Sequence, residues 1–255
     1  MSSFADAAGA RYDGSDAREL ERCLAVPRVL IFAEVSSTLD IAHREAAAGT
    51  PAGTVIVADA QSAGRGRLGR SWSSYSGAGV WLTIIERPPT SSALEALPLR
   101  VGIGLAPALD PFTDARVQLK WPNDLYVSGR KLAGVLAEAR WRDGALDWIA
   151  IGVGINIRAP RGQSQGIGLR EATSRVEVLS AAVPAIRAAA AQRGPLSAAE
   201  RAQFAERDLA AGRRCTEPAV GRVVGIDERG ALLIDSGGDV ATVRAGSLVL
   251  TEEGA

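Results

Sequence analysis

Short apolar runs bounded by polar and turn residues are the main feature of the first 160 positions. Residues 29–32, 54–58, 79–85 and 148–157 are rich in Val, Ile and Leu. Apolar runs of this length, flanked by glycine, proline and polar residues, are typical of buried strands. The sequence therefore predicts a sheet whose strands come from distant parts of the chain.

A hairpin is predicted in the middle of the chain. Residues 116–121 alternate between polar and apolar side chains, as a strand does, and Pro122-Asn-Asp124 then turns the chain into residues 125–127. Ser128-Gly129 is a two-residue hairpin signal, after which residues 131–138 return as the next strand.

Helices are predicted between these strands. Ser36 to Asp40 has N-cap chemistry directly before a helical segment. The expected helices cover residues 16–24, 41–48, 97–109, 176–192 (interrupted at Pro184) and 197–211.

The pattern changes towards the C-terminus. From Val220 onward, short apolar runs alternate with Gly and Asp turns, which is typical of a small β-barrel. The first residues are rich in Ala, Gly and Asp without periodicity, and we expect them to be disordered. We therefore expect a disordered segment at 1–14, a main domain at 15–212 and a small β domain at 213–255.

Composition excludes several classes of protein. The 255 residues carry 29 basic and 29 acidic side chains, which argues against a general binder of nucleic acid or of membrane surfaces. The N-terminus lacks a signal-peptide pattern, and no apolar run is long enough to span a bilayer. Cys23 and Cys215 are far apart and belong to no CxxC motif, so we expect free thiols and a cytoplasmic location.

Lysine is rare in this chain. Only Lys120 and Lys131 are lysines among the 29 basic residues, and the only asparagines are Asn123 and Asn156. A chain that uses arginine for nearly all positive charge is expected to keep lysine where a compact ammonium is needed. Three of these four residues fall within twelve positions, which indicates a functional cluster.

Residues 61–72, here called the lid segment, combine three arginines with three glycines. No acidic residue occurs between Asp59 and Glu86, so the segment is locally cationic. Glycines let a backbone approach a ligand closely, and arginine forks suit carboxylates and phosphates. The segment is predicted to be a lid over an anion, and an ordinary solvated basic turn is the alternative. A dinucleotide fingerprint is disfavoured because residues 70–79 lack the helical periodicity that it requires.

Four linked motifs resemble those of the biotin protein ligases in order and spacing, over roughly residues 28 to 250. The resemblance implies an α+β fold, in which a class II aminoacyl-tRNA synthetase-like mixed sheet is backed by helices and followed by a small SH3-like β-barrel. The motifs are residues 64–72, Lys120-Trp-Pro-Asn-Asp124, Lys131-Leu-Ala-Gly134 and Gly152-Val-Gly-Ile-Asn156.

The resemblance also implies an activity. Members of this family use MgATP to convert biotin to biotinyl-5′-adenylate, and then transfer biotin to one lysine of a biotin carboxyl carrier protein of a biotin-dependent carboxylase such as acetyl-CoA carboxylase. We therefore expect ATP and Mg²⁺ as co-substrate and metal, no prosthetic group, no covalent enzyme intermediate, and neither nucleic acid nor a membrane as partner. Metal ligands stay open, as does the choice between monomer and homodimer.

Motif matching assigns one set of residues to biotin. Ser37, Thr38 and Gln61 supply neutral donors and acceptors suited to a ureido ring. Trp72 would form the apolar wall, unless it is an ordinary core tryptophan, and Gly134 would let the biotin ring lie against a strand. The expected biotin site is Ser37, Thr38, Leu39, Gln61, Gly64, Arg65, Gly66, Arg67, Trp72, Lys131 and Gly134.

A second set would bind ATP and act in the reaction. Arg65 and Arg67 would hold the biotin carboxylate against the α-phosphate, and Lys131 would bridge the same two groups. Asp124 would lie near the metal and the reacting groups; the alternative is that Asn123 and Asp124 only complete a turn. The expected catalytic residues are Arg65, Arg67, Asp124 and Lys131, and the expected ATP-binding residues are Arg67, Arg70, Trp72, Asn123, Lys131 and Asn156.

Some features depart from the family pattern. Leu39 stands where many relatives have asparagine, which removes a possible hydrogen bond to biotin. Residues 160–168 contain no aromatic side chain to stack on adenine. About 27 residues precede the first strand, too few for a helix-turn-helix domain, so we expect an enzyme without repressor function.

Three alternatives stay open at this stage. Lipoate protein ligases share the adenylation logic but generally lack these forms of the lid and of the Lys120–Asp124 turn. An RNA-binding module would require exposed aromatics and a basic pI, whereas the sequence pI is about 6.6. A sensor of biotinyl-adenylate is the third. The lone His43 is expected to be a packed or solvated side chain rather than a catalytic base.

Overall fold

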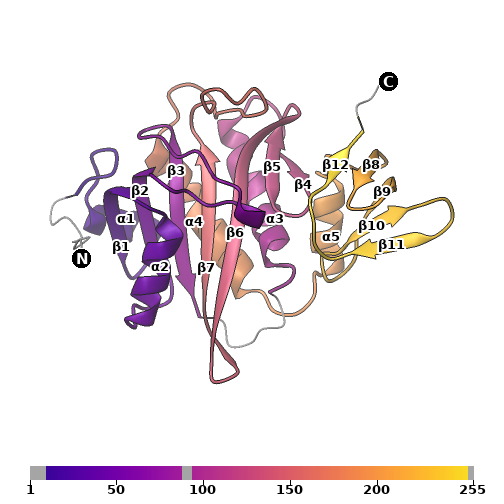
Figure 1. The fold of residues 1–255 in the computed structure, drawn as a ribbon. Coiled ribbons are helices and arrows are strands. Elements are labelled where there is room, and N and C mark those ends of the chain that lie inside the picture. The colour runs from indigo at the N-terminus through magenta and orange to yellow at the C-terminus, as the bar shows by residue number, and fades with distance from the viewer. Residues whose placement is uncertain (1–9, 88–93, 252–255) are drawn as a thin grey trace.

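The computed structural model describes residues 10–87 and 94–251. In these residues a seven-stranded mixed sheet has the order β1-β2-β3-β7-β6-β5-β4, and a smaller antiparallel sheet has the order β11-β10-β9-β8-β12 (Figure 1). Strands β1 and β2 are parallel, and the other neighbours in the large sheet are antiparallel. Its strands are β1 (Val29–Val35), β2 (Thr54–Gln61), β3 (Gly79–Glu86), β4 (Gln118–Lys120), β5 (Asp124–Val127), β6 (Arg130–Arg142) and β7 (Ala145–Asn156).

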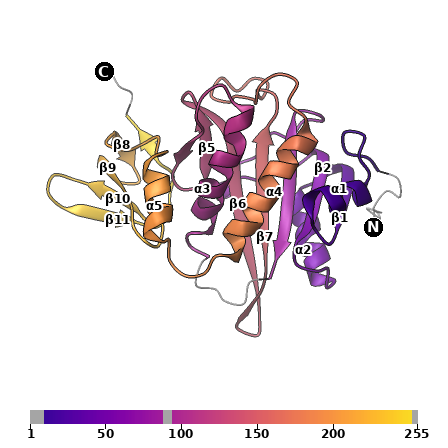
Figure 2. The same cartoon turned by 180° about the vertical axis from the view of Figure 1, so that it is seen from behind.

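Helices cover both faces of the large sheet. Helices α1 (Ala17–Leu24), α3 (Leu97–Leu109) and α4 (Arg175–Ala191) lie on one face (Figure 2), and α2 (Thr38–Ala47) lies on the other. Successive strand residues therefore enter different cores. Val55 and Val57 pack in the core under α3 and α4, whereas Ile56 packs in the core under α2. This burial on both faces explains why the strands are apolar runs rather than alternating ones.

The hairpin predicted at Ser128-Gly129 is confirmed. Both residues have positive φ angles, 49° and 73°, which matches the right-handed twist of the flanking strands. The hairpin joins β5 to β6 and places Lys131 opposite Tyr126.

The C-terminal strands form a separate small sheet. They are β8 (Arg214–Glu217), β9 (Gly221–Ile226), β10 (Leu232–Asp235), β11 (Val240–Val243) and β12 (Val249–Leu250). The fold class expected from the sequence, α+β with a large mixed sheet and a small β unit, is confirmed. The indole nitrogen of Trp121 donates to the Gly230 carbonyl at 2.9 Å, which links the turn after β4 to the small sheet.

Two predicted helices differ in the structure. Helix α5 (Ala198–Ala205) ends six residues earlier than expected, because the chain then runs beside β4, where Leu119 pairs with Asp208. Helix α4 continues through Pro184, so the predicted interruption is wrong. A proline inside a helix destabilises it by about 3 kcal/mol, whereas burying one Val or Leu side chain stabilises the fold by about 1.5–3 kcal/mol. Three side chains on either side of the proline are buried, namely Leu179, Val183 and Ile186. The free energy gained by burying them therefore exceeds the cost of the proline.

The expectation of disorder over residues 1–14 is wrong for its described part. Tyr12 is 1% exposed and pairs with Ser15, and the Arg175 guanidinium lies 4.3 Å from the centre of its ring. Arg175 also forms ion pairs with Asp13 and Asp59, which ties this segment to β2 and α4. Residues 1–9 lie outside the described residues. Every helix in the described part of the chain is too short or too polar to cross a membrane.

Candidate active site

A cavity of about 290 Å³ lies on the α2 side of the large sheet. Its walls come from the start of α2, the lid segment, the turn after β4, the strands β6 and β7, and residues 247 and 248 of the small unit. Segments far apart in the sequence thus converge on one space. All but two of the site residues predicted from the sequence line it, the exceptions being Gly64 and Asn156.

Uncharged groups at the start of α2 form a connected hydrogen-bond network. The Gln61 carbonyl accepts from the backbone nitrogen of Thr38 at 2.8 Å and from its hydroxyl at 3.2 Å. The Gln61 amide nitrogen donates to Ser74 at 2.7 Å, and Thr83 donates to Thr38 at 2.8 Å. These bonds fix the orientation of the Gln61 amide at the cavity wall.

Ser37 has two roles in this geometry. It is the N-cap of α2, where its hydroxyl accepts from the Leu39 nitrogen at 3.3 Å, and it lines the cavity while only 1% exposed. Ser37 is therefore both the helix cap and part of the cavity wall.

The lid segment folds back on itself. The Gly66 nitrogen donates to the Arg70 carbonyl at 2.7 Å, and the Trp72 nitrogen donates to the Gly64 carbonyl at 2.8 Å. A Cβ atom on Gly64 would lie 2.4 Å from the Trp72 carbonyl oxygen, so this close approach requires glycine. Gly64 thus shapes the lid without lining the cavity.

The three lid arginines are held at three different places around the cavity. Arg65 forms ion pairs with Glu138 on β6 and Asp40 on α2, at 2.9 and 3.1 Å. Arg67 donates to the Asn123 side chain at 3.2 Å, and Arg70 donates to Ser247 of the small unit at 3.1 Å. The lid therefore spans the cavity and has a contact on each of its sides.

Positive charge predominates in the cavity. The charged residues described along its walls are the cations Arg65, Arg67, Arg70, Lys120 and Lys131 and the carboxylate Asp124. Lys131 pairs with Asp124 at 2.7 Å, and its Nζ lies 5.1 Å from the centre of the Trp72 ring. Such a wall suits a ligand that carries several negative charges.

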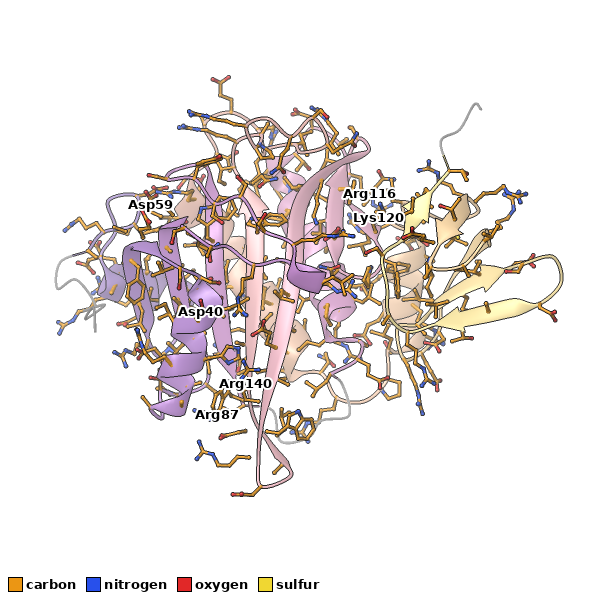
Figure 3. The ribbon with its side chains drawn as sticks, viewed as in Figure 1. Asp40, Asp59, Arg87, Arg116, Lys120 and Arg140 are labelled. Atoms are coloured by element: carbon orange, nitrogen blue, oxygen red, sulfur yellow. The ribbon has the colours of Figure 1, made fainter. Side chains whose placement is uncertain are left out.

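Lys120 is a cavity residue that the predicted site omitted. Its Nζ lies 5.4 Å from the centre of the Tyr126 ring, between the large and the small sheet (Figure 3). Burial lowers the pKa of Lys120, and the charge of Asp124 opposes this effect while those of Lys131, Arg213 and Arg70 add to it. The rarity of lysine was the signal that could have identified it.

Trp72 is a wall of the cavity rather than a simple core residue. Its indole lies against the backbone of Gly134 and Gly154, where added Cβ atoms would approach it to 3.2 and 2.5 Å. The face of Gly134 that was expected to meet the biotin ring is thus partly covered by Trp72. Gly152 provides the same kind of space for Leu39, at 3.1 Å.

Asn156 lies in an adjoining cavity of about 180 Å³. It is 5% exposed, and its amide donates to the Lys131 carbonyl at 3.3 Å. Trp72, Tyr126 and Lys131 line both spaces, so the two cavities share a wall. Across the described residues, no group of three His, Cys, Asp or Glu side chains is placed to hold a metal ion.

His43 lies outside the cavity and is packed. Its Nδ1 accepts from the Trp148 indole at 3.0 Å, and its Nε2 lies 2.7 Å from a Glu138 oxygen. Burial lowers the pKa of His43, while the hydrogen bond to Glu138 opposes this shift.

Comparisons with known proteins agree with this arrangement. The profile of the biotin/lipoate A/B protein ligase family matches residues 32–156. The biotin–[acetyl-CoA-carboxylase] ligase of Mycobacterium tuberculosis is 30% identical over 238 residues, which cover 86% of this chain and 87% of that protein. The bifunctional ligase/repressor of Bacillus subtilis is 37% identical over 130 residues, 50% of this chain, and the match spans 40% of that longer relative.

A solved structure extends the similarity to the whole fold. The biotin protein ligase of Aquifex aeolicus in complex with biotin and ATP superposes with a TM-score of 0.73 and 27% identity, over 88% of this chain and 99% of that one. The fold and the cavity thus define a protein of the biotin/lipoate ligase class. The chain belongs to the biotin/lipoate A/B protein ligase family and, within it, to the biotin protein ligases.

Proposed function

We propose that this protein uses ATP to convert biotin to biotinyl-5′-adenylate and then transfers the biotinyl group to a lysine of a biotin carboxyl carrier protein. One observation carries the proposal: a single cavity combines a fixed network of uncharged donors and acceptors with five cationic side chains. Biotin has a neutral ureido ring and a carboxylate, and ATP adds a triphosphate. The neutral network would bind the ureido ring, and the cationic side chains would bind the carboxylate and the phosphates.

The neutral part of the site would recognise the ureido ring. Ser37, Thr38 and Gln61 supply hydroxyl and amide groups whose directions are already set by their own hydrogen bonds. Trp72 would cover the apolar side of the bicyclic ring. Preset polar groups lose little conformational freedom on binding, which favours affinity.

The cationic part of the site would bring two anions together. In the first step a biotin carboxylate oxygen attacks the α-phosphorus of ATP, a new C–O–P linkage forms, and the bond to the β-phosphate breaks to release pyrophosphate. Arg67 and Lys131 would stabilise the charge that develops on the α-phosphate oxygens, and Arg70 and Lys120 would meet the phosphates that leave. Positioning and charge suffice, so no covalent enzyme intermediate is proposed.

A magnesium ion would enter with the nucleotide. Mg²⁺ in ATP-using enzymes is commonly held by one or two carboxylates together with the phosphates. Asp124 is the one carboxylate among the described cavity residues and is the residue that would hold it, with Asn123 beside it in the turn. When bound, the ion would neutralise part of the phosphate charge.

In the second step the carrier lysine would attack the acyl carbon. An amide bond forms, AMP leaves with the electrons of the acyl–oxygen bond, and the amine loses a proton. Asn156 would hold the nucleotide from the adjoining cavity during this step. A lid that excludes water protects the adenylate until the carrier arrives.

We also propose a division of labour along the chain. Residues 15–212 would form the ligase domain and residues 213–255 an appended β domain. The contact between Arg70 and Ser247 supports a role for the second unit at the mouth of the site. The proposed location is the cytoplasm, where carboxylases and ATP are available.

ATP–pyrophosphate exchange tests this function. The purified protein is given biotin, lipoate or octanoate separately, and exchange is expected with biotin only. Transfer of labelled biotin to a carrier domain then tests the second step. Exchange with lipoate or octanoate but not with biotin would assign the protein to the lipoate ligases, and no exchange with any acid would refute an adenylating enzyme.

A further inference from the structure

One lid arginine is engaged by acidic residues rather than left available for an anion. Arg65 contacts both oxygens of Glu138, at 2.9 and 3.3 Å, and one oxygen of Asp40 at 3.1 Å. Asp40 lies on α2, on the face of the sheet that carries the lid (Figure 3). Two carboxylates therefore contact one guanidinium and offset part of the charge that Arg65 brings to the cavity. Its Nε is buried and has no hydrogen-bond partner among the described residues.

Glu138 is itself held in place by His43. The Trp148 indole donates to Nδ1 of His43, so that nitrogen is unprotonated. In the neutral ring the proton then lies on Nε2, which donates to Glu138 at 2.7 Å. The His43 side chain is 13% exposed and that of Glu138 is 21% exposed. A chain of contacts thus runs from β7 through α2 and β6 to the lid.

The arrangement has the geometry of a tether. Arg65 and Glu138 are 73 positions apart in the sequence, and the two parallel contacts of a guanidinium with a carboxylate fix direction as well as distance. Arg65 is also paired with Ser71 on the returning half of the lid, so holding it holds both halves.

We propose that Glu138, oriented by His43 and assisted by Asp40, is a positioning residue that tethers Arg65 and holds the lid across the cavity. Its effect on the reaction intermediate rests on the proposed function, whereas its effect on the lid does not. Opening of a lid is a local equilibrium, and each contact removed shifts it towards the open form. Weakening this tether would therefore expose the lid and let biotinyl-adenylate escape.

Limited digestion with trypsin tests the tether in the protein without ligands. Trypsin cuts after arginine, and the lid contains three arginines, so the cut fragments identified by mass spectrometry report on lid opening. Glu138→Gln keeps the shape of the side chain but removes its charge. We expect lid cleavage to become about two- to fivefold faster, in line with the modest stabilisation by a partly exposed ion pair.

Asp147→Asn is the matched control. Asp147 pairs with Arg87 at 2.9 Å and is 19% exposed, close to the value for Glu138, but it does not line the cavity. We expect its lid cleavage to equal that of the unchanged protein. Equal lid cleavage in Glu138→Gln and in the control would overturn the tether. Because no substrate is present, this result is independent of whether the protein is a ligase.

Retention of the adenylate tests the consequence. Biotin and ATP are added without a carrier, and free biotinyl-adenylate is separated from the protein over time. We expect Glu138→Gln to release adenylate several times faster while the rate of its formation changes less than twofold. His43→Phe removes both ring hydrogen bonds, and we expect its rate of adenylate release to lie between those of the unchanged protein and Glu138→Gln. Unchanged or slower release in Glu138→Gln would refute the proposed consequence, whereas failure to form adenylate in the unchanged protein would refute the proposed function.

Discussion

Gly134 on β6 and Gly154 on β7 are direct cross-strand partners. Both lack a side chain on the same patch of the sheet, and the Trp72 indole lies over that patch. The lid therefore ends in an aromatic ring that rests on bare backbone. Any Cβ atom in this patch would change the shape of the cavity wall.

Gly154→Ala is the first test of this contact. Its Cβ would come within 2.5 Å of the Trp72 indole nitrogen, so the ring must move, whereas at Gly134 the contact would be 3.2 Å. We expect biotin affinity to fall by at least about tenfold in Gly154→Ala, and by less in Gly134→Ala. Isothermal titration with biotin measures both. Equal affinities in both variants and the unchanged protein would show that Trp72 does not shape the biotin site.

A variant of Lys120 tests whether binding of biotin can be separated from the reaction with ATP. It lines the cavity beside Tyr126, away from the neutral network around Gln61. We expect Lys120→Gln to bind biotin with nearly unchanged affinity but to lower the rate of ATP–pyrophosphate exchange by about ten- to a hundredfold, because one preorganised cation is lost. Lys131→Gln is the comparison variant and is expected to weaken both. An exchange rate within twofold of the unchanged protein would exclude Lys120 from the reaction.

A substitution at Leu39 is expected to change both the affinity for biotin and the stability of the fold. It is 3% exposed, packs against Gly152 and lines the cavity. We expect Leu39→Asn to bind biotin about three- to tenfold more tightly through one new hydrogen bond. Placing an amide in this apolar site should lower the free energy of unfolding by about 1–3 kcal/mol. Calorimetry and urea unfolding measure the two effects, and weaker binding of biotin would contradict the proposed position of Leu39 at the ring.

Asp208 makes stability depend on pH. Burial raises its pKa from 3.8 to about 6. Because the folded-state pKa lies above the unfolded value, the native protein binds more protons in this range, and stability falls as pH rises from about 4 to 6. The amide introduced by Asp208→Asn keeps an oxygen that can accept from the Ala210 nitrogen, as the carboxylate does. We expect this substitution to raise the free energy of unfolding at pH 8 by about 1–2 kcal/mol.

Urea unfolding at two pH values checks this prediction. At pH 8 the unchanged protein carries a buried charge that the variant lacks, whereas at about pH 4 the aspartate is protonated in the folded state and the two proteins should differ little. A stability difference that is the same at both pH values would indicate an effect of packing rather than of charge.

The sequence by itself determined the elements and most members of the site. Apolar runs, caps and the Ser128-Gly129 turn are local signals, because the backbone preferences of neighbouring residues decide them. The four motifs likewise identified the cavity walls, since most of the predicted residues line one space. Local signals failed where a distant contact intervened, as at the early end of α5, where Asp208 pairs with Leu119.

Only the tertiary structure decided how these parts work together. The three lid arginines look alike in the sequence, but in the fold each has a different partner. Arg65 forms an ion pair with Glu138, whereas Arg67 donates to Asn123 and Arg70 donates to Ser247. In the fold, Asn156 lines the adjoining cavity rather than the main one, and Lys120 lines the main cavity. The physical reason is register: which side chains meet depends on how distant strands pair, and side chains change face with every residue of shift.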